Sequence, residues 1–122
     1  MEKRKTTPGS AKALTIKDLQ AAVDRWIKTY GVRYFSEMTN LAVLMEEVGE
    51  LARIISRTYG EQSFKASPKK PDFADEIADV LFVLVCLANQ TGVDLEAAFS
   101  RNLKKKTDRD NFRHRNNPKL KT

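Results

Sequence analysis

Two acidic residues inside an otherwise apolar helical segment constrain this chain most. The stretch from Asp72 to Gln90 has no proline or glycine and includes nine consecutive apolar residues, Val80 to Ala88. Its length favours a helix over a buried strand. Glu76 falls in the middle of the arc that this helix presents to a core, and Asp79 lies about 60° to one side. A dry, ionised and unpaired carboxylate there costs several kcal/mol, so a base, a proton or a metal must compensate for it.

Three more helices are expected from apolar spacing and from helix start and stop signals. Thr15 caps the first, with Asp18 as an acidic variant of the capping box. The three run from about Thr15 to Tyr30, from Thr39 or Asn40 to about Tyr59, and from Asp94 to at least Lys105. The stretch 61–71, with two prolines and three lysines, is expected to be a loop. No alternating strand pattern occurs, so the predicted fold class is all-α, a bundle of four main helices.

The ends of the chain are basic and its body is acidic. At 122 residues the chain is one domain, and its net charge is +6, yet residues 13–100 hold nine basic and thirteen acidic residues. We expect a flexible basic N-terminus over 1–12, a helical catalytic domain over 13–110 and a basic polar tail over 111–122, fraying beyond Asp108. A nucleic-acid binder usually presents a basic stripe on its folded surface, so bases gathered on tails argue against a nucleic-acid partner.

Two observations indicate the compartment. Nine apolar residues fall well short of the ~20 that a membrane span needs, so we expect no membrane association. Cys86 is the only cysteine and sits inside that run, which excludes a disulfide within the chain and fits a reducing cytosol. The predicted localisation is therefore cytoplasmic.

The second helix also carries acids beside its apolar stripe. That stripe is expected to face the core and consists of Leu41, Leu44, Val48, Leu51 and Ile55. Glu47 falls about 40° from its edge and Glu50 about 60° further on, with Glu46 nearer the solvent face. Such acids often form only a solvated face or pair with bases such as Arg53. Two acidic pairs on helices joined by one loop, however, can face each other and bring four carboxylates to one point.

The types of ligand restrict what these carboxylates hold. Oxygen-only ligation suits Mg²⁺, Mn²⁺ or Ca²⁺. Di-iron bundles need Glu-x-x-His on two helices, and the only histidine is His114 in the basic tail. No ligand-spaced cysteine or histidine exists for zinc. Since Mg²⁺ bound by a few protein groups normally also engages substrate phosphates, the pattern points to phosphate chemistry.

The sequence resembles the MazG-type nucleoside triphosphate pyrophosphohydrolases, all-α enzymes of nucleotide house-cleaning, most closely their short single-domain bacterial members. The resemblance covers roughly residues 15–112, and its motif reads Glu46-Glu47-Val48-Gly49-Glu50, then Glu76-Ile77-Ala78-Asp79. It implies that Glu47, Glu50, Glu76 and Asp79 ligate Mg²⁺, with Mn²⁺ as a substitute. It also implies attack by water at the α-phosphorus of a nucleoside triphosphate, giving a monophosphate and pyrophosphate. We expect Glu46 and Glu47 to be the catalytic residues, with Glu46 orienting that water.

The resemblance extends to substrate contacts. Relatives place a lysine and an asparagine on the last helix against the phosphates, where this chain has Lys105 and, four residues on, Arg109. We expect these two to bind phosphate. Trp26, Tyr30 and Tyr34 are the candidates for stacking the base.

Two other functions fit parts of the sequence. One is a non-catalytic nucleic-acid-binding helical module that uses the basic termini; the other is a structural oligomerisation domain whose acids pair with bases. Assembly is expected in any case, because a helix that is apolar all round cannot be covered by three neighbours. We expect Phe82 and Val85 to remain exposed and to form the interface of a homodimer or homotetramer, as MazG-type relatives also suggest.

Overall fold

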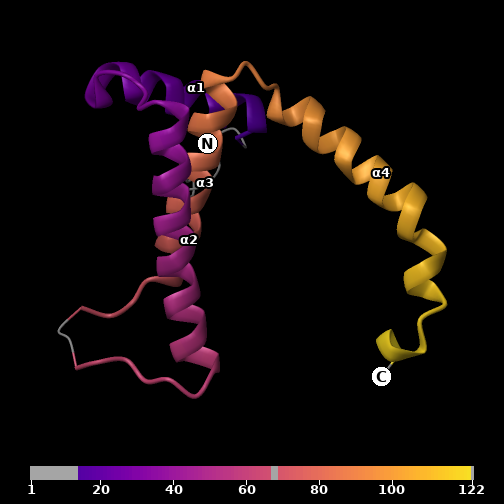
Figure 1. Cartoon of the computed structure of the whole chain (residues 1–122). Helices are drawn as coiled ribbons and strands as arrows, with labels where there is room; N and C mark the ends of the chain where they lie inside the picture. Colours follow the sequence, from indigo (N-terminus) through magenta and orange to yellow (C-terminus); the bar gives the residue numbers. More distant parts are fainter. Residues whose placement is uncertain (1–13, 67–68, 122) are drawn as a thin grey trace, which may run out of the picture.

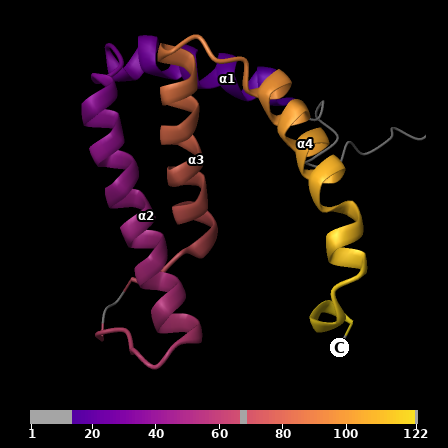
Figure 2. The same ribbon diagram turned by 45° about the vertical axis from the view of Figure 1, so that its right-hand side comes forward.

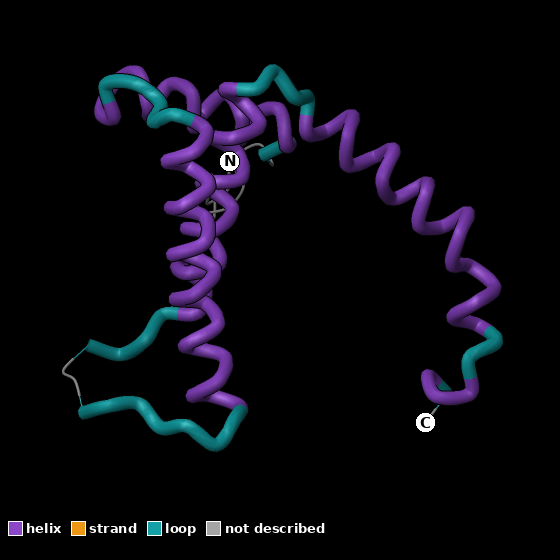
Figure 3. Tube along the Cα trace, in the orientation of Figure 1, coloured by secondary structure: helices purple, strands orange, loops and turns teal. Residues whose placement is uncertain are grey.

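The computed structural model describes residues 14–66 and 69–121, so the expected flexible segment 1–12 lies outside it. The described residues form helices and no strand (Figure 3), which confirms the all-α prediction. The elements are α1 (Ile16–Trp26), the π-helix η1 (Ile27–Gly31), α2 (Glu37–Tyr59), α3 (Phe73–Gln90), α4 (Leu95–Arg115) and the short 3₁₀ helix η2 (Pro118–Leu120).

Side-chain caps fix where the helices begin. The Thr15 hydroxyl accepts a hydrogen bond from the Asp18 amide, and the Asp18 carboxylate accepts one from the Thr15 amide, so the predicted capping box is present. Asp72 and Asp94 cap α3 and α4. α2 begins earlier than predicted, because Ser36 caps it by accepting from the amide three residues on.

α2 and α3 form an antiparallel hairpin, and α1 crosses it at the end opposite the connecting loop (Figures 1 and 2). The core cluster lies where α1 and η1 meet α3, and it joins Val23 and Ile27 to Val85 and Cys86. Val85 is 0% exposed. The expectation that Val85 forms an exposed patch is therefore wrong: α1 covers this side of α3.

Phe82, the other residue of that expected patch, is partly buried. It packs against the core cluster, and its ring lies edge-on to the Trp26 ring, with 5.5 Å between centroids. The residues of α3 that remain exposed instead include Leu81 and Leu84. A helix that is apolar all round does not reveal which side its neighbours will cover.

α2 is rotated relative to the expected orientation. Leu41, Val48 and Ile55, taken from the sequence as core-facing, are 45%, 46% and 41% exposed. Asn40 and Ile54, which lie on the same arc of the helix as Glu47, are buried instead. The acidic arc of α2 thus faces α3, and part of the apolar stripe is left at the surface.

α4 departs from the hairpin and is longer than expected. In both ribbon views it runs away from α2 and α3 after its start near α1 (Figures 1 and 2). The chain does not fray beyond Asp108, because α4 continues to Arg115. Asp110 supports this last part: it is buried and pairs with Arg109 at 2.8 Å and with Arg113 at 3.0 Å. Residues 111–115, assigned to the polar tail, therefore belong to α4.

Within the described parts of the chain, no single helix is both long enough and apolar enough to cross a membrane. α3 and α4 meet the criteria only as a pair, and they are bent by 108° relative to each other.

Truncating Val85, which is fully buried, should lower the free energy of unfolding more than truncating an exposed valine does. Val85→Ala is expected to lower the free energy of unfolding by about 2 kcal/mol, through lost apolar burial and a residual cavity. Val93→Ala, the matched control at a residue that is 42% exposed, should lower it by less than about half of that. Urea denaturation measures both, and equal losses would contradict the assigned core.

Candidate active site

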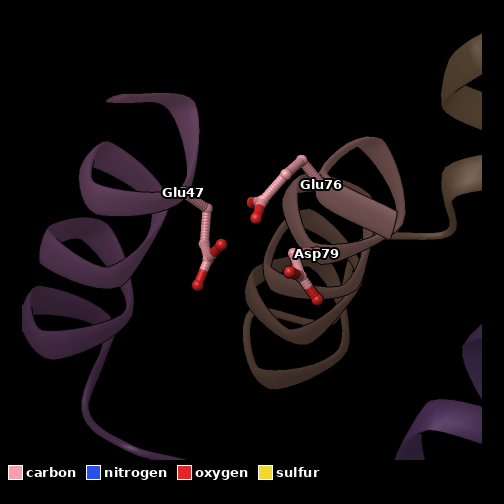
Figure 4. Close-up of side chains that lie close together, drawn as sticks. All are labelled: Glu47, Glu76 and Asp79. Atoms are coloured by element: carbon pink, nitrogen blue, oxygen red, sulfur yellow. The ribbon is translucent and has the colours of Figure 1, made fainter. Parts of the chain in front are cut away.

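Three carboxylates converge between the two helices of the hairpin. Glu47 projects from α2 and Glu76 projects from α3 toward each other, and the Asp79 carboxylate lies beside them on α3 (Figure 4). One carboxylate oxygen from each lies within 4.8 Å of the others. The three-residue spacing places Glu76 and Asp79 one above the other on α3, and the rotation of α2 brings Glu47 opposite them.

This arrangement is electrostatically unfavourable without a cation. The pKa of Glu47 is raised, first by loss of hydration and then by the charges of Asp79 and Glu76. The pKa of Glu76 is raised by the same two effects, with Asp79 as the first charge acting on it. Moreover, Glu76 Oε2 is buried and has no hydrogen-bond partner among the described residues. An acceptor without a donor, in an all-oxygen cluster, fits a divalent cation.

The remaining acids of the motif lie beside this cluster. Glu46 and Glu50 are both exposed, and their charges contribute to the raised pKa of Glu47. The Glu50 carboxylate is held 3.4 Å from Arg53 Nε in a solvent-exposed ion pair. Of the four predicted ligands, the structure thus brings three together and leaves Glu50 turned toward a base.

An aromatic cavity opens from the cluster toward α1. It has a volume of about 330 Å³, and Glu47 and Asp79 form part of its wall. Trp26 and Tyr34, two of the three base-stacking candidates, line it together with Phe82. The third candidate, Tyr30, lies outside it, 73% exposed and with its ring centroid 6.0 Å from that of Trp26.

Hydrogen bonds between helices fix the position of Tyr34 in this wall. Its hydroxyl donates to Asp24 Oδ1 at 2.7 Å and accepts from Asn89 Nδ2 at 3.1 Å. Burial, and then the bond to Asp24, raises the pKa of Tyr34 to about 12, so the phenol remains protonated at neutral pH. Nearby, Asn40 donates to Gln90 at 2.7 Å, which ties the start of α2 to the end of α3.

The segment before α2 is backbone-strained. Val32 has φ 70°, in the left-handed region, where a β-branched residue is costly by roughly 1–3 kcal/mol. It directly follows η1, and π-helical turns frequently occur at functional sites. Arg33, Tyr34 and Phe35 follow this turn directly, and all three line the aromatic cavity. The sequence predicts no role for Arg33, because the spacing of the residues around it does not indicate this turn.

A second cavity of about 480 Å³ lies on the loop side of the cluster, and Glu76 lines it. Its basic lining residues are Arg53, Lys65, Lys69 and Lys70. The sequence identified the three lysines only as members of a loop. Their proximity to the carboxylates depends on the path of the loop. Hydrophobic periodicity predicts helices and strands, but it does not predict the path of a loop.

The predicted phosphate-binding pair lies elsewhere in the chain. Lys105 and Arg109 line a surface depression on α4, which runs away from the hairpin (Figure 1). Arg109 already donates to Asp110 through Nε and Nη2, at 2.8 to 3.1 Å. Within one chain, therefore, the structure does not bring this pair to the carboxylates.

Comparisons with known proteins agree with this fold. The MazG nucleotide pyrophosphohydrolase domain matches residues 35–114. The uncharacterised protein YpjD of Bacillus subtilis (strain 168) is 48% identical over 99 residues, covering 81% of this chain and 89% of that protein. YvdC, an uncharacterised protein of the same organism, is 30% identical over 105 residues, covering 77% and 96%.

Two solved structures are also similar. The crystal structure of YpjD, described as a candidate pyrophosphatase, has a TM-score of 0.72 at 46% identity and covers 81% of this chain and 99% of that chain. A MazG protein conserved in Bacillus, described as a nucleotide pyrophosphohydrolase, has a TM-score of 0.64 at 38% identity, with coverages of 77% and 90%.

The fold, the carboxylate cluster and these similarities together define an all-α hydrolase that acts on nucleotide phosphoanhydrides. The chain belongs to the MazG nucleotide pyrophosphohydrolase family. This confirms the family predicted from the two acidic motifs, and the acidic cluster supplies the oxygen ligands that a divalent metal requires.

Glu76→Gln should stabilise the metal-free protein at neutral pH, because it removes a poorly hydrated charge that Asp79 repels. The raised pKa means that the native state holds this proton more tightly than the unfolded chain does. That contribution to stability is complete below pH 4.5, the ordinary value, and is lost as the pH rises through the raised pKa. The gap in melting temperature between variant and wild type should therefore be small in acid and widen toward neutral pH.

Calorimetry in EDTA measures this gap across the pH range. Glu37→Gln, an exposed change in the first turn of α2, serves as the charge-matched control and should show no such widening. A gap that stays constant, or that narrows as the pH rises, would contradict the assigned repulsion.

Proposed function

We propose that this protein hydrolyses nucleoside triphosphates, canonical, deoxy or non-standard, to monophosphates and pyrophosphate in a reaction that depends on Mg²⁺. The observation that carries the proposal is the convergence of Glu47, Glu76 and Asp79, with one Glu76 oxygen left without a donor. Oxygen-only ligands of this kind prefer hard cations, so Mn²⁺ can substitute for Mg²⁺. The cytoplasmic location and the absence of a nucleic-acid partner remain predictions.

Glu47, Glu76 and Asp79 hold the cation from two helices. Glu50 completes the set by turning away from Arg53, since its present ion pair is exposed and therefore weak. When bound, Mg²⁺ offsets charge on the phosphate oxygens and lowers the pKa of a coordinated water. The rigid α2–α3 hairpin keeps these ligands in place before substrate arrives.

The chain's own residues then direct the hydrolysis. Glu46, exposed next to Glu47, orients the attacking water and accepts its proton. The water oxygen bonds to the α-phosphorus, the bond from that phosphorus to the bridging oxygen breaks, and pyrophosphate leaves with the electron pair. Trp26 and Tyr34 contact the base in the aromatic cavity, while Tyr30 supports the Trp26 ring from outside.

We propose a homodimer or homotetramer formed through the face of the hairpin opposite α1. At about 100° per residue, the exposed apolar residues of α2 and those of α3 are both rotated by slightly more than a right angle from the acidic face. Because the helices are antiparallel, equal rotations place both sets on the same side of the hairpin. The residues concerned are Leu41, Met45, Val48 and Ile55 on α2, and Ile77, Leu81 and Leu84 on α3.

A contiguous apolar surface of this kind is typical of a subunit interface. Two hairpins that meet through it would form a four-helix arrangement with two-fold symmetry. The phosphate-binding role of Lys105 and Arg109 also needs a second subunit, because α4 of the same chain lies away from the carboxylates (Figure 2). In the assembly, α4 of one subunit serves the site of another.

The reaction is tested by incubating the protein with a panel of nucleoside triphosphates and millimolar Mg²⁺. We expect equimolar monophosphate and pyrophosphate, and Mg²⁺ or Mn²⁺ should raise the melting temperature by binding the native state. Glu47→Gln should lower turnover by at least about 100-fold and abolish the thermal shift, because it removes a ligand charge. Glu37→Gln, with the same chemical change on exposed α2 surface, should alter neither.

Release of orthophosphate and a diphosphate would place the attack at the γ-phosphorus and contradict this proposal. So would full turnover in the presence of excess EDTA.

The interface is tested by sedimentation velocity at micromolar concentration. Leu84→Glu is expected to yield a monomer, because it buries a charge in the apolar face. Leu14→Glu, the same change at a residue that is 76% exposed, should leave the assembly intact. A monomeric wild type, or an undisturbed Leu84→Glu oligomer, would contradict the interface.

A further inference from the structure

We propose that the basic cavity on the loop side of the carboxylate cluster binds the β- and γ-phosphates of the substrate and then the departing pyrophosphate. Its binding groups are Arg53, Lys65, Lys69 and Lys70, four bases from the end of α2 and from the loop. This inference rests on the proposed function, since it assigns the place of the leaving group in that reaction.

The cavity shares a wall with the cluster. Glu76 lines the cavity and also belongs to the carboxylate triad, and its Oε2 atom is the buried acceptor without a hydrogen-bond partner. A cation satisfying that atom therefore sits where the two regions join. Phosphate oxygens on such a cation would lie beside the basic cavity of about 480 Å³, where Arg53 and the loop lysines could bind them.

The other side of the cluster is unsuited to a polyanion. There Glu47 and Asp79 open onto the aromatic cavity, whose other lining residues include Trp26 and Phe82. Along the hairpin the order is thus aromatic cavity, carboxylates, basic cavity. Residues of α2 line these three regions in the same order: Asn40 the aromatic cavity, Glu47 the cluster and Arg53 the basic cavity. At a rise of 1.5 Å per residue, successive residues of these three lie about 10 Å apart along the helix axis.

This order gives the substrate one direction. An apolar base fits the end near α1, the α-phosphorus falls at the cluster, and the pyrophosphate half points toward the loop. The reverse orientation would place three or four negative charges among aromatic rings and beside Glu47 and Asp79, with no base in that wall except Arg33.

The bases in the chamber are suited to exchange partners with phosphate. Among the residues that the structure describes, the Arg53 side chain pairs with Glu50 alone, at 3.4 Å in an exposed ion pair. When Glu50 turns to a cation, the guanidinium becomes free to bind phosphate oxygens, for which its planar fork is suited. Lys65 and Lys70 make no hydrogen bond or ion pair with any other residue that the structure describes. The acids opposite them, Asp72 and Asp75, lie at the start of α3, where Asp72 is already engaged as its cap.

The test is calorimetric titration of the full-length protein with pyrophosphate in Mg²⁺, and with an α,β-imido nucleoside triphosphate that cannot be cleaved. The double variant Lys65→Ala/Lys70→Ala should weaken both affinities by at least about tenfold, through loss of two charge-assisted contacts. Its affinity for a nucleoside monophosphate should change less than about twofold, because that product lacks the leaving group. Inhibition of the reaction by pyrophosphate should weaken in parallel.

The charge-matched control is Lys17→Ala/Lys106→Ala, two exposed lysines on α1 and α4. It removes the same net charge and should leave all three affinities unchanged. An equal loss of affinity in the control and in the loop variant would mean that only the net charge of the protein matters, and it would overturn the inference. So would an unchanged pyrophosphate affinity in the loop variant.

Failure of this inference is distinguishable from failure of the proposed function. If the loop variant binds pyrophosphate like wild type while Glu47→Gln remains inactive, the function stands and the location of the leaving group is wrong. If the wild type releases no pyrophosphate from any nucleoside triphosphate, the proposed function itself fails, and this inference fails with it.

Discussion

The main constraint on this structure is the repulsion between three carboxylates that two helices hold face to face. The packing of the helices must outweigh this repulsion. Glu47 on α2 and the pair Glu76 and Asp79 on α3 have oxygens within 4.8 Å of one another, and the buried Oε2 atom of Glu76 has no hydrogen-bond partner among the described residues. Poor hydration and mutual repulsion raise the pKa of both glutamates. The hairpin persists because apolar contacts of α3 with α1 and α2 outweigh this local cost, and the cost becomes binding energy once a cation arrives.

The surroundings of the cluster follow from how that hairpin is supported. α1 crosses one end of it and buries Val85, and the same contact forms the wall of the aromatic cavity. The loop closes the other end and brings lysines beside Glu76. The third side is left apolar and exposed, and it is the face through which we propose that a second subunit packs. The proposed substrate direction and the proposed assembly therefore both follow from how the α2–α3 hairpin is supported.

The sequence predicts much of this and fails in physically specific places. Helix starts such as Thr15 follow from local capping, and the carboxylates Glu47, Glu76 and Asp79 follow from their helical spacing, so both are recoverable from the sequence. The side of α3 that becomes buried is not, because Val85 and its neighbours are apolar in every direction and tertiary contacts decide among them. Tertiary contacts also decide how α2 is rotated, where α4 runs and where the loop lysines lie. These three features are therefore seen only in the structure.

The central claim is that one divalent cation resolves the repulsion within the triad. The most direct measurement is anomalous diffraction from crystals grown with Mn²⁺, recorded on wild type and on Asp79→Asn. We expect a single strong peak in the wild type at roughly 2.1 to 2.2 Å from oxygens of Glu47, Glu76 and Asp79, lost or greatly weakened in the variant. A peak bound only by other acids, or one of equal strength in both proteins, would contradict the account.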